Sequence, residues 1–312
     1  MASKKITIQD FANHFGLVCI SGDISSMLRP IEEVSINRPG LELAGFFDYP
    51  RSKRIIFLGN KEMAYISTMK EEDMKKAFEF LLEDVCPGLV ICQGHKCPPL
   101  LLELAKERKF PIFLSNRQTN DLNMDTVVYL YDALAPTTSI HAALVEMYSS
   151  GVLILGESGI GKSEVTLELI KKGHNLVSDD RVNISSVRGK LFGEAPDLLV
   201  GMMEVRGIGI VDVTRMFGIN TLVKRTEISF AIKLVKFDPA DQTERIGKKV
   251  QYLEILNQKI PMLTIPVYAG RSVAELVEVA VTNLKLKQFG YDSSFEFENR
   301  LNELLSQKKG GR

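Results

Sequence analysis

Residues 151–164 read GVLILGESGIGKSE, and this stretch decides the fold of the second half of the chain. Gly156, Gly161, Lys162 and Ser163 match the pattern G-x-x-x-x-G-K-[ST] at the required spacing. An apolar run of strand-forming residues precedes the first glycine, and SEVTLELIKK follows with the spacing of a helix. The sequence therefore predicts a strand, a phosphate-binding loop and a helix in direct succession.

The predicted loop has the chemistry of a polyphosphate site. Its glycines allow backbone N–H groups to converge on phosphate oxygens, and the start of the helix adds a partial positive charge. Lys162 would reach the β- and γ-phosphates of ATP, or a pyrophosphate, and the Ser163 hydroxyl would bind Mg²⁺. The predicted nucleotide-binding residues are Gly156, Glu157, Ser158, Gly159, Ile160, Gly161, Lys162 and Ser163. The motif alone leaves open an ATPase, a GTPase, a kinase or a switch protein.

Two adjacent carboxylates follow the next predicted strand. Asp179 and Asp180 come directly after HNLVS (174–178). A carboxylate at a strand end near a phosphate loop can coordinate Mg²⁺ or accept the proton of an attacking hydroxyl. Neighbouring side chains on a strand point to opposite faces, so we expect only one of the two to face the nucleotide. A solvated strand end is the alternative interpretation.

Three further residues are weaker candidates when each is taken alone. His141 precedes the loop, Glu204 lies in MEVRGIGIVD (203–212), and Arg245 lies in ERIGKK (244–249). A core histidine, a surface glutamate and an exposed cation are the ordinary interpretations of such residues.

Composition narrows the function classes. The 312 residues are 45% hydrophobic and 25% charged, as in a globular protein with a core, and Lys+Arg and Asp+Glu both number 39. A zero formal charge argues against binding nucleic acid through a global basic field. The N-terminus lacks a signal-peptide core, and no stretch approaches the roughly 18 apolar residues of a membrane span. We expect a cytoplasmic protein that binds neither membrane nor nucleic acid.

Three of the four cysteines crowd around His95 in CPGLVICQGHKC (86–97). Their spacing matches no common zinc pattern, and GLVIC is typical of a buried strand that runs into a turn. We therefore favour small buried side chains over a metal site.

The order of predicted elements suggests two α/β domains. Strands and helices alternate in the first part, which we assign to residues 1–130, and the polar stretch SNRQTNDLNMD (115–125) is predicted to be a loop. Residues 131–312 form the second domain. Several strand-like runs follow its first helix, which favours a mixed sheet, and SVAELVEVAVTNLKLKQFG (272–290) predicts a long amphipathic helix whose apolar face packs inside the domain or across subunits.

Five motifs together make the chain similar to the HPr kinase/phosphorylase family of bacteria. They span nearly the whole chain in the expected order, which a generic phosphate loop does not explain. They are NRPGLELAGFFDY (37–49), GVLILGESGIGKSE (151–164), KKGHNLVSDDRV (171–182), MEVRGIGIVDV (203–213) and GRSVAELVEVAVTNLKLKQFG (270–290).

This resemblance implies a fold and an activity. The fold would be a small N-terminal α/β domain and a C-terminal P-loop kinase domain with a core similar to that of phosphoenolpyruvate carboxykinase, assembled as a homohexamer. The activity would be Mg²⁺-dependent phosphorylation of a serine of the phosphocarrier protein HPr, with ATP or pyrophosphate as donor. Inorganic phosphate would reverse the reaction and release pyrophosphate. The enzyme would regulate sugar uptake and carbon metabolism.

The resemblance also implies roles for individual residues. Lys162 and His141 are catalytic by this comparison, as is Arg245. Asp180 matches the carboxylate that accepts the serine proton and returns one in reverse, with Asp179 beside it. The metal ligands would be Ser163 and Glu204, and the segment 203–212 is tied to both reactions.

The sequence departs from the family pattern at a few positions. Glu157 stands where Asp is common, and Ala142 where Gly is common. The segment linked to dephosphorylation usually resembles PVRPGR and here reads PVYAGR (266–271), so that Tyr268 replaces a cation and Ala269 replaces a proline.

Two other function classes stay open. A nucleotide-dependent regulatory switch would need the lysine and the metal groups, but it would not need a serine-activating base at Asp180. A small-molecule enzyme of the carboxykinase type is the third interpretation, although the sequence offers no further cluster of histidines and carboxylates for it.

Overall fold

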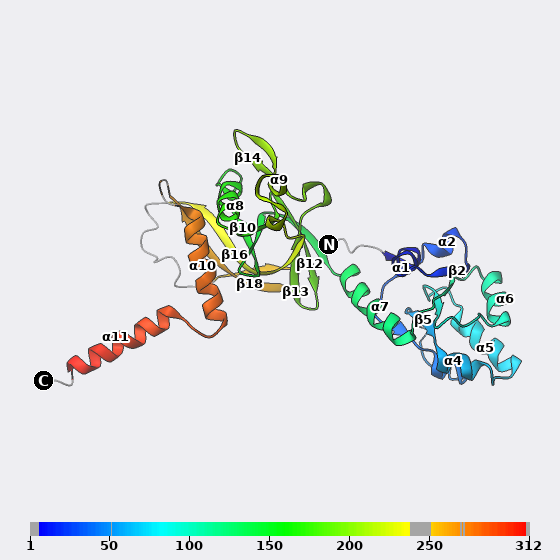
Figure 1. Cartoon of the computed structure of the whole chain (residues 1–312). Helices are drawn as coiled ribbons and strands as arrows, with labels where there is room; N and C mark the ends of the chain where they lie inside the picture. The colour runs from blue at the N-terminus through cyan, green and yellow to red at the C-terminus, as the bar shows by residue number, and fades with distance from the viewer. Residues whose placement is uncertain (1–5, 51, 238–250, 269, 271, 310–312) are drawn as a thin grey trace. The chain divides into compact units, whose positions relative to one another are not determined.

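The chain divides between Ala135 and Pro136 into two compact units, each with its own sheet (Figure 1). The computed structural model describes residues 6–50, 52–237, 251–268, 270 and 272–309. Each unit is a mixed α/β structure, as the sequence predicts.

The N-terminal unit is built around a five-stranded sheet in the order β2-β7-β6-β5-β4. Four of its strands are parallel and β2 runs antiparallel at one edge. The strands are β2 (Val18–Ser21), β4 (Ile36–Asn37), β5 (Ile55–Leu58), β6 (Leu89–Ile91) and β7 (Ile112–Leu114), and β1 (Ile6–Thr7) pairs with β3 (Pro30–Ile31). The helices are α1 (Ile8–Phe15), α2 (Ile24–Met27), α3 (Gly40–Leu43), α4 (Asn60–Ile66), α5 (Glu71–Leu81), α6 (Pro99–Glu107) and α7 (Thr119–Ala133).

Both faces of this sheet are buried, which explains its uninterrupted apolar strands. In β5, Ile56 and Leu58 pack in one core with residues of α5 and α6. Ile55 and Phe57 point the other way, into a core shared with α1 and α7. Cys86 lies in the first core and Cys92 in the second, so these thiols are buried as predicted, and burial raises the pKa of Cys86 to about 12.

The predicted loop at 115–125 is wrong, because α7 begins at Thr119. Its buried side chains are spaced about one turn apart, at Thr119, Leu122, Thr126 and Leu130. Its first two turns carry the exposed polar residues Asn120, Asp121 and Asp125, so the apolar signal at the start of this helix is too sparse to outweigh its polar composition. Tertiary packing on the sheet, more than local propensity, makes this segment helical.

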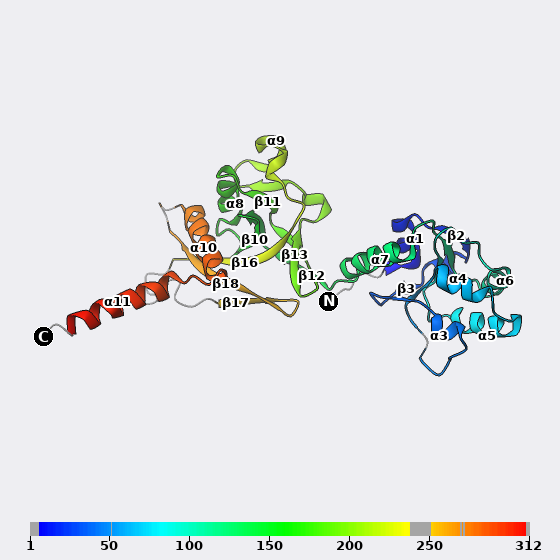
Figure 2. The ribbon, with the colours of Figure 1, turned by 60° about the horizontal axis from the view of Figure 1, so that its bottom comes forward.

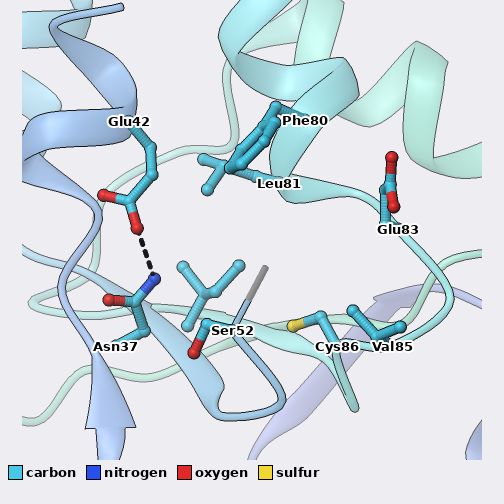
Figure 3. A pocket seen from close by; sticks show the side chains of 9 residues that line it. Asn37, Glu42, Ser52, Phe80, Leu81, Glu83, Val85 and Cys86 are labelled. Atoms are coloured by element: carbon cyan, nitrogen blue, oxygen red, sulfur yellow. Dashed lines mark hydrogen bonds between the residues drawn. The ribbon is translucent and has the colours of Figure 1, made fainter. Parts of the chain in front are cut away.

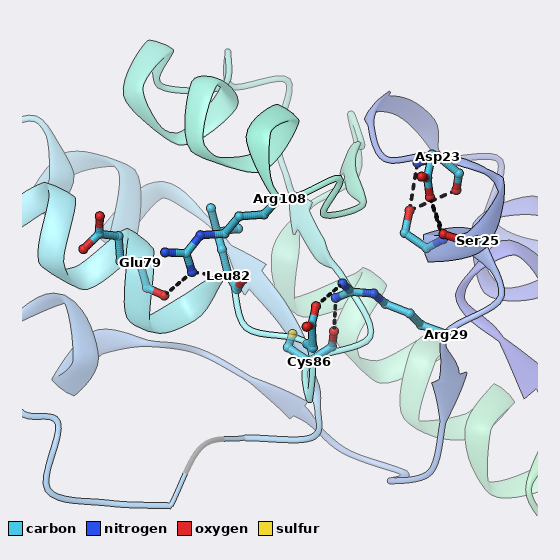
Figure 4. A network of polar contacts seen from close by, with 9 residues as sticks. Asp23, Ser25, Arg29, Glu79, Leu82, Cys86 and Arg108 are labelled. Atoms are coloured by element: carbon cyan, nitrogen blue, oxygen red, sulfur yellow. Dashed lines mark hydrogen bonds and ion pairs between the residues drawn. The ribbon is translucent and has the colours of Figure 1, made fainter.

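Arg29 and Arg108 donate hydrogen bonds to backbone carbonyls of the N-terminal unit (Figure 4). Arg29 donates to the carbonyl of Cys86 at 3.0 Å and to Asp84 at 2.7 Å, and its guanidinium lies over the ring of Phe110. Arg108 donates to the carbonyl of Glu79 at 3.0 Å. The Glu79 carbonyl in the last turn of α5 and the Cys86 carbonyl in the loop before β6 thereby gain partners that the regular structure does not supply.

The C-terminal unit holds a nine-stranded mixed sheet within its described residues. The main path is β11-β9-β10-β16-β13-β12-β8, and β18 joins β16 and forms a hairpin with β17 (Figure 2). Among the described strands of this sheet, only β10/β16 and β16/β18 pair in parallel. The strands are β8 (Thr137–His141), β9 (Ala143–Met147), β10 (Ser150–Leu155), β11 (Asn175–Ser178), β12 (Arg181–Val187), β13 (Lys190–Glu194), β16 (Arg225–Lys236), β17 (Gln251–Ile255) and β18 (Gln258–Val267).

Two helices, α8 (Lys162–Lys171) and α10 (Val273–Gln288), cover one face of this sheet. Val165 and Leu169 of α8 share a core with Val277 and Val281 of α10. The apolar side of the long predicted helix therefore packs inside its own unit. The remaining elements are η1 (Asp197–Leu199), β14 (Met202–Val205), β15 (Gly209–Asp212), α9 (Val213–Phe217), η2 (Ile219–Thr221) and α11 (Ser293–Lys309). In the part of the chain that the structure describes, no helix combines the length and apolarity needed to cross a membrane.

Candidate active site

The phosphate-binding loop (P-loop, residues 156–163) connects β10 to α8, as predicted. Gly156 has a φ of 153°, and a Cβ there would lie 2.9 Å from the carbonyl oxygen of Leu234 on the neighbouring strand. Gly161 has a φ of 106° and is the N-cap residue of α8. Gly156 is needed because the Leu234 carbonyl approaches it closely, and Gly161 is needed because its backbone is left-handed.

Lys162 is buried at the base of the P-loop. Its side-chain ammonium donates to the carbonyl oxygens of Gly156 at 3.1 Å and Glu157 at 3.2 Å. Among the described residues no carboxylate lies within ion-pair distance of it. Its full positive charge is therefore available to a polyanion held in the loop.

Ser163 is joined to the first of the two aspartates. Its hydroxyl donates to Asp179 Oδ1 at 3.1 Å. Asp179 is only 2% exposed, and its Oδ2 atom has no hydrogen-bond partner among the described residues. Burial raises the pKa of Asp179, and the bond from Ser163 opposes that rise in part. A buried carboxylate oxygen without a partner, next to a P-loop hydroxyl, fits the donor set that Mg²⁺ prefers.

The hairpin β14–β15 brings Glu204 to the same place. Met203 is buried against Ile170 of α8, which anchors the hairpin on the helix that follows the P-loop. The backbone N–H of Glu204 acts on the Asp179 carboxylate and lowers the pKa of Asp179. The Glu204 backbone thus lies near the Asp179 carboxylate.

Asp180 pairs with His141. Their atoms Oδ1 and Nδ1 are 3.0 Å apart, and both side chains are about half exposed. Strand pairing explains the contact, because His141 stands opposite Arg181 in the β8/β12 ladder. In the sequence alone, His141 is most simply interpreted as a core histidine. In the structure it contacts Asp180 instead.

The two aspartates do not lie on a strand, which corrects the reason given for their opposite directions. β11 ends at Ser178, and Asp180 has a φ of 66° in the turn that leads to β12. Arg181 N–H donates to the carbonyl of Asp179 across this turn at 2.8 Å. The turn sends Asp179 into the protein and Asp180 toward solvent. One carboxylate therefore faces the P-loop serine and the other stays accessible.

Arg245 lies outside the described residues, as do Ala269 and Arg271. Tyr268 follows β18, and its ring packs on that of Phe237 with 4.4 Å between the centroids. This aromatic pair follows the last residues of the parallel strands β16 and β18. The C-terminal end of β10, where the P-loop begins, lies at the same end of the sheet.

One residue at the P-loop escaped prediction from the sequence. Arg206, in the turn of the β14–β15 hairpin, places Nη2 only 2.6 Å from where a Cβ of Gly159 would be. The available signal was its position in the segment 203–212, which the resemblance ties to both reactions.

The N-terminal unit contains a small hollow of a different kind, in which Asn37 donates to Glu42 at 3.0 Å (Figure 3). Phe80, Leu81 and Val85 supply much of its lining. Nearby, Arg38 makes a bidentate ion pair with the buried Glu62, with Nε 3.0 Å from Oε1 and Nη2 2.7 Å from Oε2. The motif at 37–49 thus has a structural explanation inside this unit.

Comparisons with known proteins cover both units. The family model described as HPr Serine kinase N terminus matches residues 6–130, and the one described as HPr Serine kinase C-terminal domain matches residues 132–301. An HPr kinase/phosphorylase of Geobacillus kaustophilus is 38% identical over 302 residues, which is 96% of this chain and 97% of the relative. One from Lactobacillus gasseri is 41% identical over 277 residues, or 88% of this chain and 87% of the relative.

A solved structure is also similar. The Hpr(Ser) kinase/phosphatase from Coxiella burnetii is 35% identical, with a TM-score of 0.46, and the match covers 51% of this chain and 98% of that chain.

Proposed function

The chain belongs to the HPr kinase/phosphorylase family, and from this premise we propose that it phosphorylates a serine of HPr and removes that phosphate by phosphorolysis. The observation that carries the proposal is the divided pair of aspartates. Asp179 is buried on the P-loop serine, whereas Asp180 is accessible and paired with His141. The turn at residues 179–180 therefore joins two functions: Asp179 faces the phosphate-binding loop, and Asp180 is the carboxylate that can accept a proton.

Ser163 and Glu204 are the proposed metal ligands, with the unpartnered Oδ2 of Asp179 beside them. When bound, Mg²⁺ would supply positive charge that offsets the charge of ATP or pyrophosphate. Lys162, bonded to the carbonyls of Gly156 and Glu157, contributes a second positive charge. Asp179 fixes the Ser163 hydroxyl and keeps a negative charge at the metal side of the site.

Proton transfer falls to Asp180 in this proposal. Its accessible carboxylate takes the proton of the HPr serine while that oxygen attacks the terminal phosphorus, and the bond to the donor's bridging oxygen breaks. The contact with His141 holds the Asp180 carboxylate in one orientation. Arg245 remains a predicted catalytic cation in the part of the chain that the structure does not describe.

The reverse reaction uses the same groups. An oxygen of inorganic phosphate attacks the phosphorus of phosphoserine, protonated Asp180 gives its proton to the departing serine oxygen, and pyrophosphate forms. Lys162 and the P-loop amides hold the attacking phosphate where the terminal phosphate of ATP lies in the forward reaction.

Further properties belong to the same proposal. They are a phosphoenolpyruvate carboxykinase-like core, a homohexamer, a cytoplasmic location and control of sugar uptake and carbon metabolism. A nucleotide switch without phosphotransfer is the alternative. A paired, accessible carboxylate next to the metal side argues against it, because a switch has no use for a serine-activating base.

The test is direct. Purified protein, HPr, ATP and Mg²⁺ are incubated, HPr is analysed by mass spectrometry for phosphoserine, and excess inorganic phosphate is then added with an assay for pyrophosphate. An HPr variant without the acceptor serine is the control. We expect serine phosphorylation that reverses with equimolar pyrophosphate release. ATP binding without any phosphorylation would replace this proposal with the switch protein.

A further inference from the structure

The guanidinium of Arg206 lies against the middle of the P-loop. A Cβ on Gly159 would be 2.6 Å from Arg206 Nη2 and 3.7 Å from Nη1, so both terminal nitrogens approach this glycine. Gly159 itself is exposed, with a φ of 83°. A side chain at residue 159 would displace the end of the Arg206 side chain, so glycine lets the guanidinium approach the loop.

The approach of Arg206 follows from how the hairpin is held. Met203 and Val211, on its two strands, pack against the core between α8 and β11. The turn is closed by the N–H of Ile208, which donates to the carbonyl of Val205 at 3.0 Å. Because the hairpin is anchored on α8 and closed at its tip, the backbone at Arg206 is positioned next to the P-loop.

The charge of Arg206 is not neutralised by a neighbour. Within the described ranges, no carboxylate lies at ion-pair distance from it, although the hairpin carries Asp212. That carboxylate accepts from the backbone N–H of Arg215, and its other oxygen lies 3.2 Å from Arg215 Nε. Asp212 is thus engaged by α9, and among the described residues Arg206 has no ion-pair partner.

We propose that Arg206 is a catalytic residue that binds oxygens of the transferring phosphoryl group. This inference rests on the proposed function and adds a second cation at the P-loop to Lys162. A guanidinium offers a planar fork of donors that matches two phosphate oxygens at once. It would act on the terminal phosphate of ATP in the forward reaction and on inorganic phosphate in reverse.

This role predicts a selective effect on the terminal phosphate. In Arg206→Met, affinity for ATP falls about tenfold, as expected for a lost hydrogen bond to a charged group, whereas affinity for ADP stays within about twofold. The turnover number for HPr phosphorylation falls about 100-fold or more. Arg206→Lys keeps the charge without the fork, so it recovers ATP affinity more than turnover.

Arg215→Met is the matched control, because Arg215 is an exposed arginine just beyond the same hairpin. The measurements are calorimetric affinities for ATP and ADP, turnover, and the melting temperature of each variant. Equal losses of ATP and ADP affinity, or equal losses of turnover in Arg206→Met and Arg215→Met, would overturn the inference. An Arg206→Met variant with wild-type turnover and a wild-type ATP-to-ADP affinity ratio would do the same.

The two proposals fail in different ways. A wild-type protein that phosphorylates no HPr defeats the proposed function, yet the ratio of ATP to ADP affinity still shows whether Arg206 contacts the terminal phosphate. An active wild-type protein with an equally active Arg206→Met variant defeats only the role of Arg206.

Discussion

His141 Nδ1 lies 3.0 Å from Asp180 Oδ1, on the accessible side of the turn whose other aspartate is buried on the P-loop serine. The β8/β12 ladder fixes this contact, since it places His141 opposite the residue that follows Asp180. An aspartate held by a histidine and open to solvent is positioned for a protein hydroxyl.

Replacing Asp180 by Asn is expected to abolish phosphotransfer while nucleotide binding survives. The amide keeps the size of the side chain and can still contact His141, but it cannot accept the serine proton. We expect the phosphorylation rate to fall at least about 100-fold, measured by phosphoserine formation, with ATP affinity measured in parallel. Retained kinase turnover would remove Asp180 from the role of base.

Replacing Lys162 by Ala is expected to remove both directions of the reaction. The buried ammonium has carbonyl partners in the loop, and its loss deprives the phosphates of a fixed charge in a partly enclosed site. Phosphoserine formation and pyrophosphate release are measured separately. A Lys162→Ala variant that still released pyrophosphate from phosphorylated HPr would show that the two directions use different sites.

Asp179→Asn is expected to raise the Mg²⁺ concentration required for half-maximal activity by about tenfold or more, because the buried carboxylate holds the Ser163 hydroxyl and supplies charge at the metal side. A Mg²⁺ titration of initial rates measures this. Asp180→Asn serves as the comparison, and the Mg²⁺ dependence of its residual rate should stay near that of the wild type. An unchanged Mg²⁺ requirement in Asp179→Asn would separate Asp179 from the metal site.

Tyr268→Arg is expected to raise phosphorolysis relative to phosphorylation. Tyr268 stands where the family pattern has a cation, and its ring packs on Phe237 at the strand ends beside the P-loop. A guanidinium there adds a charge that can hold inorganic phosphate. Tyr252→Arg adds the same charge on β17 at an exposed position and should leave the ratio of the two rates unchanged. Equal ratios in both variants and the wild type would contradict the prediction.

The Arg38–Glu62 pair predicts a pH dependence of stability in the N-terminal unit. Burial alone would raise the pKa of Glu62, but the Arg38 guanidinium and the Gly59 N–H outweigh it and lower that pKa. A lowered pKa means that the contribution of this carboxylate is complete above its unfolded-state pKa of about 4.3 and is lost as the pH falls toward its folded-state value.

Arg38→Met should therefore lower the free energy of unfolding by about 1–3 kcal/mol at pH 7, where it leaves a buried carboxylate short of partners. The difference from the wild type should shrink below about pH 4. Urea unfolding of the full chain, with hydrogen exchange of the β5 and α4 amides as the probe, measures this difference in the free energy of unfolding. Lys53→Met, which breaks an exposed pair with Glu32, should change little at either pH. A difference that grows on acidification would have the wrong sign.

Sequence patterns predicted the elements whose signal is local and dense. β5 and β6 are continuous apolar runs, and α10 has the apolar spacing of an amphipathic helix, so these local patterns predicted them. The start of α7 was missed because one buried residue per turn is a weak pattern in a polar stretch. The aspartates were expected on a strand because nothing in SDD marks the left-handed turn at Asp180.

The sequence by itself determined the P-loop, with its glycines, Lys162 and Ser163, because these features depend on backbone conformations and helix periodicity within a few neighbouring residues. Tertiary structure alone decided that Ser163 meets Asp179, that His141 meets Asp180, and that Arg206 meets Gly159. Those contacts depend on the β8/β12 register and on the packing of a hairpin against α8. Register and packing are set by side chains far apart in the chain, so no local pattern carries them.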